Sequence, residues 1–161
     1  YILWLRQFLK ESKEGSICMS DFKQLETRWY KAKDIIKGIG MSSETAEIEN
    51  ELLKVGKLIG CNIFFPKEKP YKTYQALYYT AIREALTNAV RHAAADELYI
   101  KIEEKLNFQK VTIFDNGSKK INFVREGNGL SALRKLMEKE GVKLKLQTEG
   151  VFKLLITFPH K

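Results

Sequence analysis

The chain has 161 residues, a net charge of +8 and a hydrophobic fraction of 44%, which fits one hydrophobic core with a helical extension and excludes a disordered chain or two full-sized domains. Its lysines alternate with acids, as in Lys67-Glu68-Lys69, so the charge indicates a solvated surface and argues against a nucleic-acid-binding stripe. A polyanionic small ligand or an acidic partner domain is equally compatible with this charge.

The apolar runs are short, such as the three residues 154–156, whereas a bilayer-spanning helix needs about 20. The chain begins at Tyr1 and not at a methionine, so we expect a piece of a longer protein, in which signal or membrane segments would lie upstream. Cys18 and Cys61 have neither metal-ligand nor disulfide spacing, which favours buried, reduced thiols.

Residues 1–60 are predicted to be mostly helical. Apolar residues at helical spacing predict one helix over 1–14 and a second from about Ser20 to the glycines at 38 and 40. A third amphipathic helix is expected to begin near Ser43 and to end at Gly60.

The hydrophobic period changes at Cys61, and the rest of the chain mixes helices and strands. The pattern predicts a strand at 61–65, a polar connector at 67–72, a helix from 73 to 90, strands at 98–103 and 110–115, a polar segment at 118–126, a helix from 130 to 140 and a terminal hairpin of 142–147 with 151–158. In the helix from 130, the apolar stripe is Leu130, Leu133, Leu136 and Met137. The fold class predicted for 61–161 is α+β, an α/β sandwich.

The helix from 73 to 90 carries polar residues beside its apolar face. Glu84, Asn88 and His92 follow each other at intervals of four residues, so they share one stripe at the border of a cavity or an interface. One interpretation is a rim of ordinary hydrogen bonds. In the other, the Asn88 carbonyl oxygen binds Mg²⁺, which needs few protein ligands, and Glu84 orients a water or a nucleophile.

Asp115-Asn116-Gly117 begins at the last residue of a predicted strand. Asn-Gly is a frequent hairpin signal, which would make 119–124 the returning strand. Alternatively, the Asp115 carboxylate meets a ligand amino group while Gly117 lets the backbone pass close by.

A third cluster, Gly127-Asn128-Gly129-Leu130, directly precedes a helix. It is either a plain loop or a phosphate site, because a glycine-rich segment at a helix start presents free N–H groups and the positive end of the helix dipole.

The order and spacing of the three clusters resemble the nucleotide site of the histidine kinase-like ATPases, which include gyrase and the sensor histidine kinases. REALTNAVRHA, DNG and EGNGLSALRKLMEKEG are similar to the N box and the first and second glycine boxes of sensor histidine kinases with short ATP lids. The resemblance covers about residues 61–159.

This resemblance implies a Bergerat-type two-layer α/β sandwich, with a mixed sheet, helices on one face, and ATP and Mg²⁺ as cofactors. Asn88 would ligate Mg²⁺, Glu84 would be the catalytic residue near the γ-phosphate, and Asp115 would accept from the adenine amino group. The remaining implied cofactor-binding residues are Arg91, His92, Gly117, Gly127, Asn128, Gly129 and Leu130. Residues 118–126 would form the lid.

The implied function is that of the ATP-binding catalytic domain of a bacterial two-component sensor histidine kinase. Its partners would be ATP, a histidine outside this chain, a response regulator and a second copy of the full-length protein, with no direct contact to nucleic acid. It would be a cytoplasmic domain of a parent protein that could be membrane-anchored elsewhere. Residues 1–60 would be the remnant of a dimerisation region or a spacer, and 61–161 the ATP-binding domain.

Three departures from the family pattern keep two alternatives open. Ser118 follows Gly117 where a second glycine is usual, Val151 stands where a threonine is frequent, and no histidine lies between residues 1 and 91. The alternatives are an anti-sigma-type serine protein kinase and a non-catalytic ATP-sensing domain.

Overall fold

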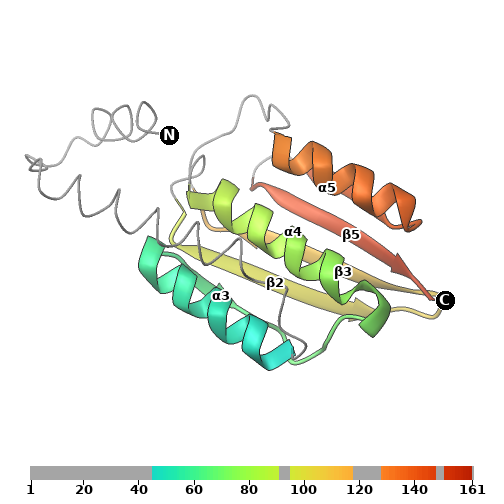
Figure 1. Cartoon of the computed structure of the whole chain (residues 1–161), viewed down its shortest axis with the longest axis horizontal. Helices are drawn as coiled ribbons and strands as arrows, with labels where there is room; N and C mark the ends of the chain where they lie inside the picture. Colours follow the sequence, from blue (N-terminus) through green and yellow to red (C-terminus); the bar gives the residue numbers. More distant parts are fainter. Residues whose placement is uncertain (1–44, 91–94, 118–127, 148–150, 161) are drawn as a thin grey trace, which may run out of the picture.

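The computed structural model describes residues 45–90, 95–117, 128–147 and 151–160, which fold into helices and strands in the predicted order (Figure 1). The elements are α3 (Thr45–Ile59), β1 (Asn62–Phe64), the short 3-10 helix η1 (Lys72–Tyr74), α4 (Gln75–Asn88), β2 (Glu97–Glu104), β3 (Phe108–Asp115), α5 (Asn128–Lys139), β4 (Lys143–Gln147) and β5 (Lys153–Pro159). The two helices predicted before Ser43 lie outside the described residues.

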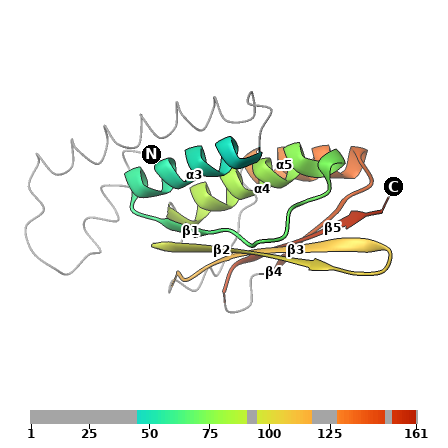
Figure 2. The same cartoon turned by 90° about the horizontal axis from the view of Figure 1, so that it is seen from below.

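The five strands form one mixed sheet in the order β1-β2-β3-β5-β4. β1 runs parallel to β2, and all other neighbours are antiparallel, including the predicted terminal hairpin of β4 and β5. The three α-helices of the described part cover the same face of the sheet (Figure 2). The described part is therefore the predicted α+β two-layer sandwich, because each helix can bury its apolar stripe only against the sheet.

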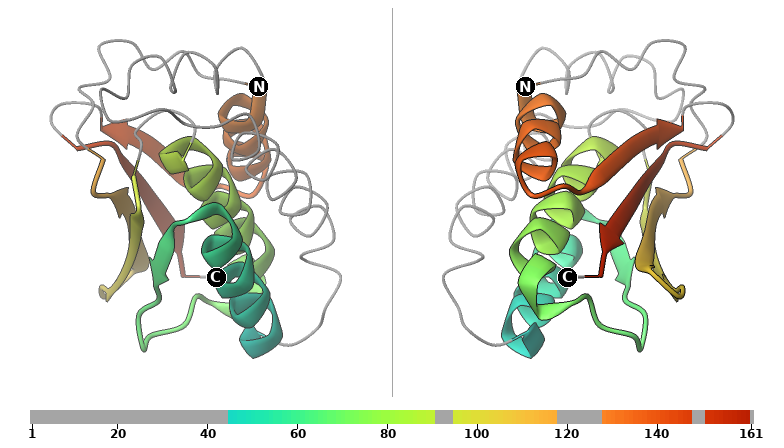
Figure 3. Two further views of the ribbon diagram at one scale, coloured as in Figure 1. Left: turned by 90° about the vertical axis from the view of Figure 1, so that its left-hand side faces the viewer. Right: turned by 90° about the vertical axis from the view of Figure 1, so that its right-hand side faces the viewer.

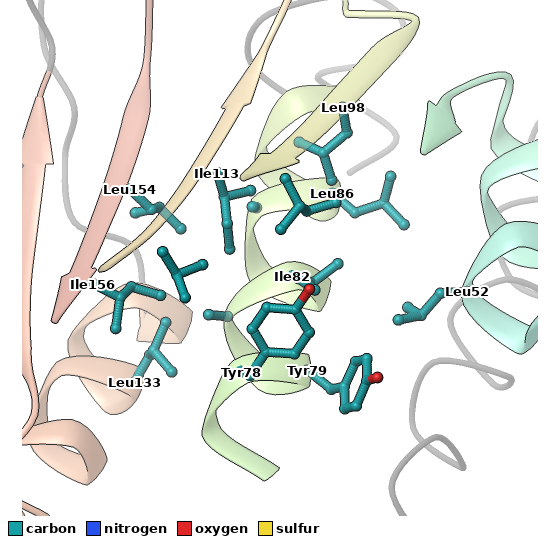
Figure 4. Close-up of a cluster of buried hydrophobic side chains, with 14 of the residues drawn as sticks. Leu52, Tyr78, Tyr79, Ile82, Leu86, Leu98, Ile113, Leu133, Leu154 and Ile156 are labelled. Atoms are coloured by element: carbon teal, nitrogen blue, oxygen red, sulfur yellow. The ribbon is translucent and has the colours of Figure 1, made fainter. Parts of the chain in front are cut away.

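The hydrophobic core lies between the helices and the sheet (Figure 4). Leu52 of α3, Ile82 and Leu86 of α4, and Leu133 of α5 face the inner side chains of β2, β3 and β5. α3 thus shares the core of the sandwich, whereas the division of the chain at residue 60 stays a prediction. Leu136, predicted on the buried stripe of α5, is 47% exposed, because Leu130, Leu133 and Met137 at i, i+3 and i+7 already fill the inner face.

Two glycines end helices as predicted. Gly60 after α3 and Gly141 after α5 have φ angles of 76° and 71°, a conformation that glycine adopts without a side-chain clash. Cys61 is a buried free thiol, as expected, and Cys18 is outside the described residues. Within the described ranges, no helix combines the length and apolarity that membrane crossing requires.

The connector before α4 is fixed to the sheet by a buried glutamine. Gln109 of β3 is 2% exposed; its Oε1 accepts from the Tyr71 N–H at 3.2 Å, and its Nε2 donates to the Lys69 carbonyl at 3.0 Å. The Tyr71 hydroxyl donates to the Glu104 carboxylate, at the end of β2. These bonds attach the connector just before α4 to strands β2 and β3.

Candidate functional site

The polar stripe of α4 is half-buried. Glu84 and Asn88 are partly exposed, and Ala85 and Leu86 between them are buried in the core. Directly after Asn88 the helix widens into a π-type turn at 89–90, a distortion that is frequent at functional sites. The interpretation of a stripe at the border of the apolar face is thus confirmed for Glu84 and Asn88, and His92 lies outside the described residues.

The side chain of Asn88 makes no hydrogen bond to any part of the described structure. Its Nδ2 is buried and without a partner. Leaving a buried polar atom unpaired costs about 1–3 kcal/mol, and the oxygen and nitrogen of a carboxamide are interchangeable by a flip of the amide. This carboxamide is therefore available to a ligand, and its oxygen is a suitable donor for a hard cation such as Mg²⁺.

Glu84 of α4 lies against the first turn of α5. A Cβ atom added to Gly129 would overlap Oε2 of Glu84 and lie 2.8 Å from its Cδ, so a larger residue at 129 would displace the Glu84 carboxylate. The first N–H groups of a helix have no partner within the helix and carry partial positive charge. The contact brings together two of the three predicted clusters, the α4 stripe and the glycine-rich helix start.

Asp115 ends β3 and points into the sandwich. It is 3% exposed, and its Oδ1 accepts from the Gly117 N–H at 2.8 Å. Burial raises the pKa of the Asp115 carboxyl, and the bond from Gly117 opposes that shift in part. Oδ2 has no hydrogen-bond partner within the described ranges, so the carboxylate can still accept a bond from a ligand.

The hairpin interpretation of Asn116-Gly117 does not fit the sheet. β3 already pairs with β2 on one side and β5 on the other, up to Phe114 and Asp115, so no edge of β3 is free for a returning strand. Residues 119–124, the supposed return strand, lie outside the described residues.

Asn116 clamps this turn to the start of β2, a role that the sequence did not reveal. Its Oδ1 accepts from the backbone N–H groups of Asp96 at 3.2 Å and Glu97 at 3.0 Å, and its Nδ2 donates to Asp96 Oδ1 at 2.6 Å. The neighbouring Ala95 N–H donates to the carbonyl of Ala89, the residue after Asn88. A continuous path of bonds therefore joins the end of α4 to the Asp115 turn.

The remaining predicted site residues divide into two groups. Leu130 is 4% exposed and packs in the core, where it supports the start of α5. Five others cannot be placed: Arg91, His92, Gly127, the Asn128 side chain and the predicted lid at 118–126 lie outside what the structure describes.

One end of the sandwich thus gathers three kinds of polar group (Figure 1). They are an unpartnered carboxamide on α4, a buried carboxylate at the end of β3, and the amide-rich start of α5 beside Glu84. In chemical terms the first suits a divalent cation, the second an amino group and the third a phosphate.

Solved histidine kinase structures share this fold. Histidine kinase AdeS of Acinetobacter baumannii aligns over 98% of this chain and 92% of its own, with a TM-score of 0.57 and 12% identity. The histidine kinase domain of the blue-light activated histidine kinase of Erythrobacter litoralis EL346 aligns over 98% of this chain and 81% of its own, at 0.50 and 17%. Another structure of the Erythrobacter litoralis EL346 kinase aligns over 83% of this chain and 53% of its own, with a TM-score of 0.52 and 18% identity. This chain therefore spans about half the length of that structure. No protein-family model matches the chain, and no curated protein matches its sequence.

Proposed function

We propose that this chain is the ATP-binding catalytic domain of a sensor histidine kinase. The observation that carries the proposal is the buried, unpartnered carboxamide of Asn88, which lies at the same end of the sandwich as the Asp115 turn and the start of α5. A magnesium triphosphate joined to an adenine offers a partner to each of these groups. The fold shared with histidine kinase structures supports the same conclusion.

In this proposal each group binds a different part of the nucleotide. The Asp115 carboxylate accepts a charge-assisted hydrogen bond from the adenine amino group. A bond of this kind at a buried site contributes about 1.5–3 kcal/mol to the binding free energy. Asn88 holds Mg²⁺, whose chemistry when bound is to neutralise charge on the phosphates. Gly127 to Gly129 and the N–H groups of α5 hold phosphate oxygens, and Glu84 lies beside them near the γ-phosphate.

We propose that the γ-phosphoryl group of ATP is transferred to a histidine outside this chain and from there to a response regulator. The domain contributes positioning and charge stabilisation, the main terms in enzymatic phosphoryl transfer. The functional parent would be a homodimer, with the catalytic domain in the cytoplasm, where ATP is available. We keep the division into a helical segment at 1–60 and an ATP-binding domain at 61–161 as part of this proposal.

The proposal predicts both nucleotide binding and a defined phosphorylated product. Calorimetric titration should detect ATP binding that is stronger with Mg²⁺ than without it. With γ-labelled ATP and a supplied histidine-containing dimerisation helix, the label should appear on the helix as an acid-labile, base-stable phosphohistidine. The same helix with its histidine replaced by alanine is the control and should stay unlabelled. Binding without transfer would instead indicate an ATP-sensing domain, and an acid-stable phosphoserine on a partner would indicate a serine kinase.

Gly129→Ala should separate catalysis from folding. The added methyl group would overlap Glu84 Oε2, and the end of this side chain can move, so we expect the unfolding free energy to change by less than about 1 kcal/mol. The displaced carboxylate and crowded helix start should lower the phosphotransfer rate by about 100-fold, as for other 1 Å misplacements in active sites.

The matched control for Gly129→Ala is Ala132→Ser, at an exposed position of the same helix. Its phosphotransfer rate and its unfolding midpoint should both stay close to those of the parent chain. A Gly129→Ala protein with full transfer rate would show that the close approach of α5 to Glu84 has no part in the reaction.

A further inference from the structure

The face of the sheet opposite the helices carries a second set of side chains. Since the three described helices lie on one side (Figure 2, Figure 3), alternate residues of each strand project from the other side, which no described element covers. The strand register arranges them in rows that cross the sheet. The rows are Phe64, Tyr99, Phe114, Lys153, Gln147; then Lys101, Thr112, Leu155, Lys145; then Glu103, Lys110, Thr157, Lys143. We call these residues the open face.

The first row begins with a ladder of three aromatic rings. Phe64 and Tyr99 stack with centroids 4.8 Å apart and planes at 10°, and Tyr99 and Phe114 stack at 5.2 Å and 16°. The spacing equals the distance between neighbouring strands, so the ring planes stand upright between strands and their edges point outward. Lys101 Nζ and Lys153 Nζ lie 5.3 and 5.8 Å from the Phe114 centroid, at cation–π distance.

The charge of the open face is predominantly positive. Its lysines come from four strands, with those at 101, 143 and 145 exposed and those at 110 and 153 half-buried. The one acid of the open face, Glu103, has its carboxylate 3.3 Å from the Lys105 ammonium group. Glu97, at the start of β2 beside this face, accepts a hydrogen bond from the Tyr99 hydroxyl at 2.6 Å. Lysines two residues apart on a strand are about 6.6 Å apart. Acidic residues of a partner segment have a similar spacing at positions i and i+4 of a helix or i and i+2 of a strand.

We propose that the open face binds an acidic protein segment. An aromatic ring carries positive charge at its edge and negative charge at its face, so outward ring edges and the surrounding ammonium groups both favour carboxylates. This inference concerns the sheet surface on the side away from the Asn88 and Asp115 groups, and it does not depend on the proposed nucleotide chemistry.

The geometry disfavours the other occupants of a basic, aromatic surface. Single-stranded nucleic acid binds to such surfaces by stacking bases on exposed ring faces. Here the faces of Tyr99 and Phe114 are covered by neighbouring rings and by the Lys101 and Lys153 ammonium groups, which leaves only the outer face of Phe64, a residue that is 45% exposed. Insertion into a membrane needs several apolar side chains that protrude, whereas Tyr99 and Phe114 are half-buried and Phe64 alone is exposed, at 45%. A second copy would present the same positive charge and would be repelled.

The test compares two double variants with the same change of charge. Lys145→Gln with Lys153→Gln removes two charges from the open face, and Lys54→Gln with Lys57→Gln removes two exposed charges from α3 on the other side. Binding of a fluorescein-labelled poly-glutamate peptide is measured by anisotropy, and circular dichroism confirms that each variant is folded. We expect the open-face variant to bind about tenfold more weakly and the α3 variant to bind like the parent chain.

Two results would overturn the inference. Equal losses in both variants would show that the peptide responds only to net charge. An open-face variant that loses affinity for single-stranded oligothymidylate or for phosphatidylserine vesicles, but keeps its affinity for poly-glutamate, would assign the face to nucleic acid or to lipid. Titration at increasing salt should weaken poly-glutamate binding to the parent chain, because exposed ion pairs are screened.

Discussion

Asn88→Ala is expected to abolish Mg²⁺-dependent nucleotide binding without weakening the fold. Substitution of residues that only support metal ligands lowers metal affinity about 10- to 100-fold, so loss of a ligand itself should lower the affinity for MgATP by more than ~100-fold. The fold should tolerate the change, because the Asn88 side chain makes no hydrogen bond in the described structure, and alanine favours helix by about 0.5 kcal/mol over asparagine.

Two measurements check the Asn88 prediction. Calorimetric titration with ATP, in the presence and absence of Mg²⁺, should show that the gain from Mg²⁺ is lost in the variant, and urea denaturation should show equal or greater stability. Thr87→Ala is the control on the same helical turn, since the Thr87 hydroxyl donates only to the Arg83 carbonyl at 2.9 Å. An unchanged Mg²⁺ effect, or a stability loss above about 2 kcal/mol, would mean that Asn88 is a structural residue.

The local elements and the polar stripe of α4 could be predicted from the sequence because both depend on residues close together in the chain. An interval of four places Glu84 and Asn88 on one stripe of a helix whatever the helix packs against. Likewise, glycines at 60 and 141 end their helices with positive φ angles, a property of the residue itself. These features therefore appear in the structure as expected.

The contacts that assemble the site could not be predicted, because they depend on how distant elements pack. The approach of Gly129 to Glu84 requires α4 and α5 to be neighbours on the same face of the sheet. The hairpin interpretation at Asn116 failed because β5 occupies the edge of β3 that the hairpin would need, and strand order is not encoded in local pattern. The clamp formed by Asn116 likewise depends on β2 lying beside β3.

Asp115→Asn is expected to weaken adenine nucleotides selectively and to stabilise the fold. The variant places the NH2 group of a carboxamide opposite the adenine amino group. Both groups are hydrogen-bond donors, so the bond to adenine is lost. ATP affinity should therefore fall by about 10- to 100-fold, whereas affinity for inorganic triphosphate should stay unchanged. Equal losses for both ligands would refute the assignment of Asp115 to adenine.

The stability gain from Asp115→Asn follows from the burial of this carboxylate. Burial raises the pKa of the Asp115 carboxyl above 3.8 in the folded state, so ionisation opposes folding. This cost is absent below pH 3.8, grows as the pH rises through the folded-state pKa, and is constant above it. At neutral pH the variant should therefore unfold at a higher temperature than the parent chain, and this gain should vanish in acid. Glu103→Gln, which removes one exposed negative charge, should give neither effect. Replacing a residue whose only role is to stabilise the fold would lower the stability of the protein. A gain of stability at neutral pH together with a loss of ATP affinity would therefore identify Asp115 as a ligand-binding residue that is retained at a cost to stability.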